Sequence, residues 1–291
     1  QLQELVSTAP AIEAQPVIVQ TDLIPSQDAW LGWVSRALDS IRRGDLDKVV
    51  LARRKTLRGQ SAFSVEMALH RLRDVYPECT IFAVDSSDSA FIGATPERLA
   101  RVEAGTLSLD CLAGSAPRGS GPYEDRVLEE RLLQSPKERF EHAFVVKMAA
   151  GALNEICSDV HHNQVPEVLK LKTIQHLRTP FNGRLQPGRD ILDAVEQLHP
   201  TPAVGGVPTG RAVRLIRELE GDRGWYSSPV GWVDPDGEGE FAVAIRSALV
   251  RDNTATLFAG SGIVEGSDPR EEFAETEVKF KPLIAALTEV Q

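Results

Sequence analysis

The chain contains 291 residues, of which 42% are hydrophobic and 25% are charged, and this composition is typical of globular proteins. Its formal net charge of −10 argues against nucleic acid as a partner, and no apolar run approaches the ~18 residues of a membrane span. The three cysteines lack CxxC or Cys/His spacing, so they indicate neither a zinc site nor a disulfide framework and suit a reducing, cytoplasmic setting.

The sequence shows no internal repeat and no low-complexity linker, so we expect a single domain over residues 1–291. Residues 1–26 combine proline and polar residues with weak periodicity, which predicts an extended lead-in segment. The first residue, Gln1, is neither a methionine nor part of a signal sequence, so we expect the natural N-terminus to lie upstream.

The first helix is predicted over residues 28–43 and the first strand over residues 47–53, from helical apolar spacing and a β-branched run respectively. In the strand, Lys48 shares one face with Val50 and Ala52. Such a lysine is either a strand-end residue that reaches water or a functional amine in a pocket, and the first case is the commoner one.

A second helix, over residues 64–75, precedes a predicted antiparallel meander. The four strands of this meander cover residues 80–85, 90–93, 99–103 and 106–110. Glu97 follows a proline turn, and its simplest interpretation is a surface ion pair with Arg98 or Arg101. Residues 112–119 are rich in small side chains and predict a loop.

A long helical region over residues 123–158 is interrupted at Ser135 and Pro136. Ser135 and Glu138 have the spacing of a capping box, in which each side chain bonds the backbone amide of the other. Glu138 and Glu141 share one helix face because they are three positions apart. This pair is either an exposed acidic face, with Glu138 in a capping contact, or part of a metal site.

The following segment is predicted to contain a strand over residues 169–178, which bears His176, and a short helix over residues 191–198. A rigid turn with several prolines, over residues 199–208, then enters a helix over residues 210–219. A second meander is predicted from residues 225–226, 230–233, 240–249 and 254–258.

The last part of the chain places glycines beside an acidic helix. Residues 259–264 are small and predict a glycine bend whose backbone amides can approach a ligand closely. Asp268, followed by proline, is typical of a helix start. From there Glu272, Glu275 and Lys279 lie on one helix face. This face is either a solvated acidic helix start or, together with the earlier carboxylate pair, a site that holds one Mg²⁺.

Eight stretches in this order resemble the chorismate-utilising enzymes, a family that includes isochorismate, salicylate, anthranilate and aminodeoxychorismate synthases. These stretches are residues 48–53, 93–99, 112–119, 135–142, 199–208, 223–232, 241–248 and 259–279. The similarity extends from about residue 46 to residue 287 and is strongest to isochorismate synthase, at residues 112–119 and 200–206. Ser115 departs conservatively from the threonine that is usual at this position.

The resemblance implies an α+β fold in which two antiparallel sheets pack face to face with helices outside, within one chorismate-binding catalytic domain. Family members are usually longer at the N-terminus, in agreement with a natural N-terminus upstream. The implied reaction converts chorismate to isochorismate, by addition of water at C2 and loss of the C4 hydroxyl. We expect this reaction to require no obligate protein partner, nucleic acid or membrane.

Carried over residue by residue, the resemblance makes Lys48 the general base and Glu97 the general acid. Near pH 7 these roles require a neutral lysine and a protonated glutamic acid, whose usual pKa values are ~10.4 and ~4.3. Burial and neighbouring charges must therefore shift the two pKa values by about three units in opposite directions.

The metal and substrate contacts are implied in the same way. Glu141 and Glu275 match the direct ligands of Mg²⁺. Glu138 and Glu272 match carboxylates that hold metal-bound water. The positions that match substrate contacts are Gly114, Ser115, His176, Ala203, Tyr226, Arg246, Gly260, Gly262 and Lys279. His176 matches a residue near the leaving hydroxyl, although a hydrogen-bonded strand histidine is the alternative interpretation.

Three other functions remain open. A salicylate synthase also eliminates pyruvate, and such enzymes tend to carry threonine at the position of Ala203. Aminating synthases work with a glutaminase partner, and they carry either a glutamine-type residue in place of Lys48 or a nucleophilic lysine within residues 112–119. A non-catalytic relative is expected to have lost the base or a metal ligand, and this chain retains both.

Overall fold

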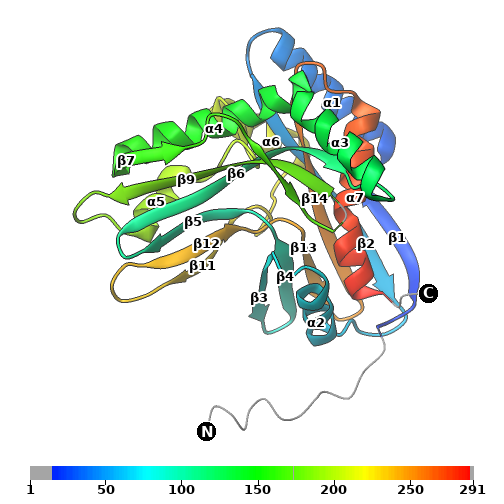
Figure 1. Cartoon of the computed structure of the whole chain (residues 1–291). Coiled ribbons are helices and arrows are strands. Elements are labelled where there is room, and N and C mark those ends of the chain that lie inside the picture. The colour runs from blue at the N-terminus through cyan, green and yellow to red at the C-terminus, as the bar shows by residue number, and fades with distance from the viewer. Residues whose placement is uncertain (1–14, 173, 289–291) are drawn as a thin grey trace, which may run out of the picture.

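Two antiparallel sheets of seven strands each form the framework of the computed structural model, which describes residues 15–172 and 174–288 (Figure 1). Sheet A consists, in order, of β1 (Ile18–Ile24), β2 (Lys48–Gly59), β14 (Thr254–Val264), β13 (Ser247–Arg251), β4 (Ser89–Thr95) and β3 (Thr80–Ser86), with β10 (Gly206–Val207) paired to β2. Sheet B consists, in order, of β11 (Pro229–Val233), β12 (Gly239–Val243), β5 (Arg98–Glu103), β6 (Thr106–Pro117), β9 (Ile174–Leu185) and β7 (Cys157–His162), with β8 (Glu167–Lys170) paired to β9.

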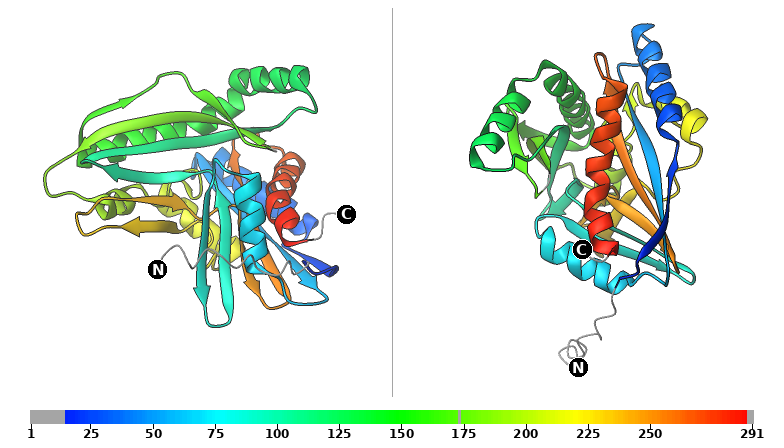
Figure 2. Two further views of the ribbon diagram at one scale, coloured as in Figure 1. Left: turned by 60° about the horizontal axis from the view of Figure 1, so that its bottom comes forward. Right: turned by 90° about the vertical axis from the view of Figure 1, so that its right-hand side faces the viewer.

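Seven helices of the described residues cover the sheets. Those that pack on sheet A are α1 (Gln27–Arg42), α2 (Val65–Val75), α6 (Thr209–Glu220) and α7 (Pro269–Leu287). Those that pack on sheet B are α3 (Pro122–Gln134), α4 (Pro136–Ile156) and α5 (Ile191–Leu198). In the right-hand view of Figure 2, α7 runs along sheet A while α3 and α4 lie beside sheet B. The predicted α+β class with two antiparallel sheets is confirmed, and none of the described helices is long and apolar enough to cross a membrane.

The starts of the helices agree with the predictions to within about one residue, and side chains cap several of them. Ser26, Ser64 and Asp268 each accept a hydrogen bond from an amide of the first helical turn. Ser135 caps α4 in the same way, but the predicted capping box is incomplete. The Glu138 carboxylate instead accepts a hydrogen bond from the backbone amide of Ser115, and so it faces β6.

Each predicted meander is divided between the two sheets, so this part of the prediction is wrong. β3 and β4 belong to sheet A and β5 and β6 to sheet B, whereas β11 and β12 belong to sheet B and β13 and β14 to sheet A. The chain therefore crosses from one sheet to the other at residues 96–97 and again at residues 244–246. These crossings place Glu97 and Arg246, two predicted site residues, between the sheets.

Two segments predicted as a loop and a bend are strands instead. β6 continues to Pro117, and β14 continues to Val264 in register with β2. The glycines of β14 allow close approach of side chains, because a Cβ at Gly262 would lie 2.2 Å from Oε1 of Glu141. The small residues of these segments therefore fit a strand as well as a loop.

Two further strand predictions are corrected. Part of the predicted lead-in, Ile18–Ile24, is β1 and pairs with β2, while residues 1–14 lie outside the described residues. The predicted strand over residues 169–178 is the end of β8 followed by the start of β9. These two strands form an antiparallel hairpin, in which Lys170 pairs with Gln175 and Glu167 pairs with Arg178. Local periodicity does not distinguish one strand from the two arms of a hairpin.

Candidate active site

A cleft lies beside the crossings at residues 96–97 and 244–246, between the two sheets and the helices α4 and α7. Its lining includes the predicted site residues Glu97, Gly114, Ser115, Glu141, His176, Ala203, Tyr226, Arg246, Gly260, Gly262, Glu275 and Lys279. The remaining predicted residues lie close to it. Lys48 is buried next to Glu141, and Glu138 and Glu272 line a neighbouring groove that shares Glu275 with the cleft.

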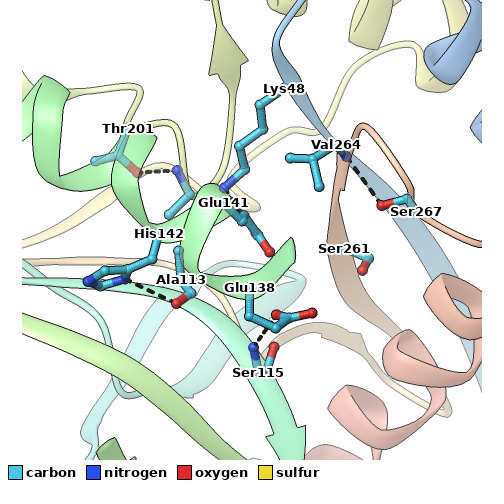
Figure 3. A network of polar contacts seen from close by, with 12 residues as sticks. Lys48, Ala113, Ser115, Glu138, Glu141, His142, Thr201, Ser261, Val264 and Ser267 are labelled. Carbon is cyan, nitrogen blue, oxygen red and sulfur yellow. Dashed lines mark hydrogen bonds and ion pairs between the residues drawn. The ribbon is translucent and has the colours of Figure 1, made fainter. Parts of the chain in front are cut away.

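Lys48 is the first residue of β2, and its side chain is completely buried, which excludes the interpretation as a strand-end lysine that reaches water. Its ammonium lies 3.0 Å from Oε1 of Glu141, on α4 (Figure 3). The two groups form an ion pair by distance, although the angles at Nζ do not satisfy a hydrogen bond to any described residue. The lysine thus keeps its hydrogen-bonding capacity for another group.

Glu97 is buried where the chain passes from sheet A to sheet B. Burial raises the pKa of its carboxyl to about 7, although the nearby charges of Lys48 and Arg246 oppose this rise. The surface ion pair considered for Glu97 does not form, because Arg98 lies 3.4 Å from Glu240 and Arg101 lies 2.9 Å from Glu103. The Glu97 carboxyl therefore loses its proton near pH 7 rather than near its usual pKa of ~4.3.

The residue Ser115 connects the carboxylates of α4 and α7. Its backbone amide donates a hydrogen bond to Oε2 of Glu138 (2.9 Å), and its hydroxyl donates one to Oε1 of Glu275 (3.1 Å). Burial and the charge of Glu141 raise the pKa of Glu138 to about 7. Burial also opposes ionisation of Glu275, but its ion pair with Lys279 outweighs this effect and lowers the pKa.

Glu272 is the most deeply buried of the four carboxylates. Its two oxygens accept hydrogen bonds from Lys137 Nζ (2.7 Å) and from the Ser261 hydroxyl (2.5 Å). Burial, together with the nearby charge of Glu275, raises its pKa. Each carboxylate is buried or half-buried near another one, so the four groups form one acidic cluster.

This cluster fits a hard divalent cation by its chemistry. All four donors are carboxylates, and Mg²⁺ is typically bound through one or two carboxylates and several waters. Among the described residues, no three His, Cys, Asp or Glu side chains are arranged around one point as ligands. Instead, three of the carboxylates each form an ion pair with a lysine, and these lysines are Lys48, Lys137 and Lys279. The donor set therefore suits Mg²⁺ held partly through water.

The other end of the cleft is cationic. Arg246 lies at the second crossing, and its Nη2 is 3.4 Å from Nε2 of His176. Burial and the charge of Arg246 lower the pKa of His176 to about 3, so this histidine is neutral and can accept from the guanidinium. Lys279 donates to the backbone oxygen of Gly260 (2.9 Å), and burial raises the pKa of Tyr226 to about 12. Two cations and a phenol therefore face a space suited to anionic groups.

Arg223 and Glu220 form an ion pair next to the cleft, and neither residue was predicted as part of the site. Arg223 donates to Glu220 (2.7 Å), to the backbone oxygen of Val50 (2.7 Å) and to that of Val204 (2.8 Å). It thereby ties the strand that carries Lys48 to the loop that lines the cleft. Its only signal in the sequence is its position at the start of residues 223–232, one of the stretches that resemble the chorismate-utilising enzymes.

Comparison with known proteins agrees with this arrangement. Residues 1–288 match the family model described as chorismate binding enzyme. The chain belongs to this family. It is 44% identical over 276 residues to isochorismate synthase MenF of Bacillus subtilis, covering 94% of this chain and 58% of that protein. It is 40% identical over 262 residues to the salicylate biosynthesis isochorismate synthase of Pseudomonas aeruginosa, covering 90% and 55%.

A solved structure in the chorismate-binding family has the same fold. The putative 2,3-dihydroxybenzoate-specific isochorismate synthase DhbC of Bacillus anthracis superposes with a TM-score of 0.90 at 34% identity, covering 95% of this chain and 76% of that one. The chain thus spans less than two thirds of the length of the two curated relatives named above. The sequence resemblance to chorismate-utilising enzymes is confirmed at the level of the family.

Proposed function

We propose that this chain is an isochorismate synthase that converts chorismate to isochorismate with the help of Mg²⁺. The observation that carries the proposal is the buried Glu97, whose pKa of about 7 allows it to act as an acid, in a cleft next to Lys48. The names of several similar proteins, which are isochorismate synthases, support the same reaction. The isomerisation consumes one water and releases another, so it needs one base and one acid.

The protons move between the substrate and two residues in this proposal. Lys48 accepts a proton from water as the water oxygen bonds to C2 of the ring. The ring double bonds shift, the C4–O bond breaks, and Glu97 donates its proton so that the C4 hydroxyl leaves as water. Return of the proton from Lys48 to Glu97 through solvent restores both residues.

The charges of the cleft orient the substrate. In this proposal Arg246 and Lys279 bind the carboxylates of the substrate. Tyr226 and the backbone around Gly260, which also line the cleft, contact the same groups. Glu141 and Glu275 would hold Mg²⁺ directly, and Glu138 and Glu272 would hold it through water. When bound, Mg²⁺ offsets the charge of the ring carboxylate as the transition state forms.

The choice among related reactions rests on three positions. Lys48 stands where anthranilate synthases carry a glutamine-type residue, and the segment over residues 112–119 has no nucleophilic lysine of the aminodeoxychorismate type. Ala203 stands where salicylate synthases tend to carry threonine. These residues favour water as nucleophile and retention of the pyruvyl group. We place the reaction in the cytoplasm, without an obligate protein partner, consistent with three free cysteines.

The proposal is tested by incubating the purified chain with chorismate and Mg²⁺, with and without ammonia, and by resolving the products by chromatography. We expect isochorismate as the only product, no effect of ammonia, and loss of turnover in EDTA. Salicylate with pyruvate, or an aminated product, would assign the chain to another branch of the family. A lack of any turnover, with chorismate still bound, would indicate a binding relative.

A further inference from the structure

Three of the four carboxylates border a second space next to the cleft. A groove lies next to the cleft and is lined by Lys137, Glu138 and Glu272, among other residues. The cleft and the groove share only Ser115 and Glu275, which therefore form the wall between them. Glu141 thus faces the substrate cleft, Glu138 and Glu272 face the groove, and Glu275 borders both.

The position of these carboxylates matters for a hydrated ion. Mg²⁺ gives up its octahedral water shell reluctantly, so proteins often hold it through water. Glu138 and Glu272 line the groove and not the cleft, so the groove is the side from which a hydrated ion can reach them.

Lys137 occupies this approach. Its ammonium lies 2.7 Å from Oε1 of Glu272 on α7 and 3.6 Å from Oε1 of Glu138 on its own helix α4. Its side chain is 27% exposed, whereas those of Glu138 and Glu272 are 16% and 1% exposed. The lysine thus neutralises one carboxylate of each helix from the solvent side, and its flexible stem leaves room to swing outward.

We propose that Lys137 is an exchangeable counter-ion, which holds Glu138 and Glu272 together in the metal-free protein and leaves them when a hydrated divalent cation enters through the groove. The inference rests on the proposed Mg²⁺ dependence. An ammonium and a divalent cation on the same two carboxylates repel each other strongly at this short distance in a partly buried site. Lys137 therefore stabilises the metal-free fold and opposes metal binding.

The test is a calorimetric titration of MgCl₂ into the EDTA-treated chain, together with its melting temperature with and without Mg²⁺. Lys137→Gln removes the competing charge, so we expect it to bind Mg²⁺ about tenfold more tightly. Without metal it should melt at a lower temperature than wild type, and saturating Mg²⁺ should close this gap. Lys147→Gln, which removes an exposed charge from the same helix, is the matched control and should bind Mg²⁺ within about twofold of wild type.

Lys137→Arg keeps the positive charge, so it tests the inference independently if the glutamine variant folds poorly. Its planar fork can engage both carboxylates, so we expect Mg²⁺ to bind as in wild type or several-fold more weakly. Tighter binding to Lys137→Arg, or unchanged or weaker binding to Lys137→Gln, would overturn the inference and make Lys137 a positioning residue. If neither wild type nor Lys137→Gln binds Mg²⁺, the proposed metal dependence fails and the inference fails with it.

Discussion

The ammonium of Lys48 lies 3.0 Å from Oε1 of Glu141, so the proposed base and a proposed metal ligand form one buried ion pair. Lys48 comes from β2, a strand of sheet A, and Glu141 comes from α4, which packs on sheet B. Removing one partner of a buried pair leaves the other charge unpaired, at a typical cost of about 3–5 kcal/mol. Variants at either position therefore need a control that also breaks an ion pair, away from the cleft.

Lys48→Gln should reduce turnover of chorismate by a factor of about 10² to 10⁴, because it removes the proposed base. Binding of chorismate with Mg²⁺, measured by calorimetry, should remain within a few-fold of wild type. Lys55→Gln is the control, because Lys55 lies on the same strand but pairs with Glu277 at 2.5 Å, and it should keep turnover. Isochorismate formation by Lys48→Gln at near wild-type rate would place the base elsewhere.

Glu141→Ala and Glu275→Ala should each abolish turnover at modest Mg²⁺ concentration, because one remaining carboxylate does not hold the ion against its hydration. Turnover is followed by coupling to an isochorismatase over a range of Mg²⁺ concentrations. Glu155→Ala removes an exposed carboxylate from α4 and should behave as wild type. Wild-type activity of either cleft variant would refute the metal assignment.

The pH dependence of kcat/KM should show a falling limb centred near pH 7, where Glu97 loses its proton. The sign follows from its role, because only the protonated form can donate to the leaving hydroxyl, and burial raises the pKa to about 7. Glu97→Gln should lose most turnover and this limb together. A kcat/KM that stays flat between about pH 6 and 9 would contradict Glu97 as the acid.

Ala203→Thr should introduce some release of pyruvate, because Ala203 lines the cleft and the added hydroxyl can reorient the substrate or water. Pyruvate is measured by coupling to lactate dehydrogenase, and isochorismate is measured in parallel. Ala203→Val adds a branched side chain of similar size without the hydroxyl and should release no pyruvate. An unchanged product ratio in Ala203→Thr would remove this position as a discriminator.

The free energy of unfolding should fall as the pH is lowered from about 6.5 to 4, partly through His142. Burial lowers the pKa of this histidine to about 4, and its ring nitrogens bond the Ala113 oxygen and the Thr179 hydroxyl. The unfolded chain gains a proton near pH 6.5 while the folded one does not, so stability is lost in this window, at up to about 1.4 kcal/mol per pH unit. Denaturant unfolding of His142→Gln should show a shallower slope, whereas exposed His161→Gln should not.

The sequence by itself determined the features that depend on neighbouring residues. A serine or aspartate cap fixes a helix start through bonds to the next few amides, and the start at Asp268 was predicted in this way. Glu272 and Glu275 share a face because helical geometry alone places residues three apart on one side. The ordered motifs also indicated the family, since they carry the residues that a common site requires.

The tertiary structure alone decided how distant segments meet. Strand periodicity shows which residues share a face but not which sheet a strand joins, so the divided meanders, and with them the position of Glu97 between the sheets, were not predictable. Lys137 becomes a candidate counter-ion only because α7 brings Glu272 within 2.7 Å of it. The raised pKa of Glu97 has the same origin, because its burial is produced by elements far apart in the chain.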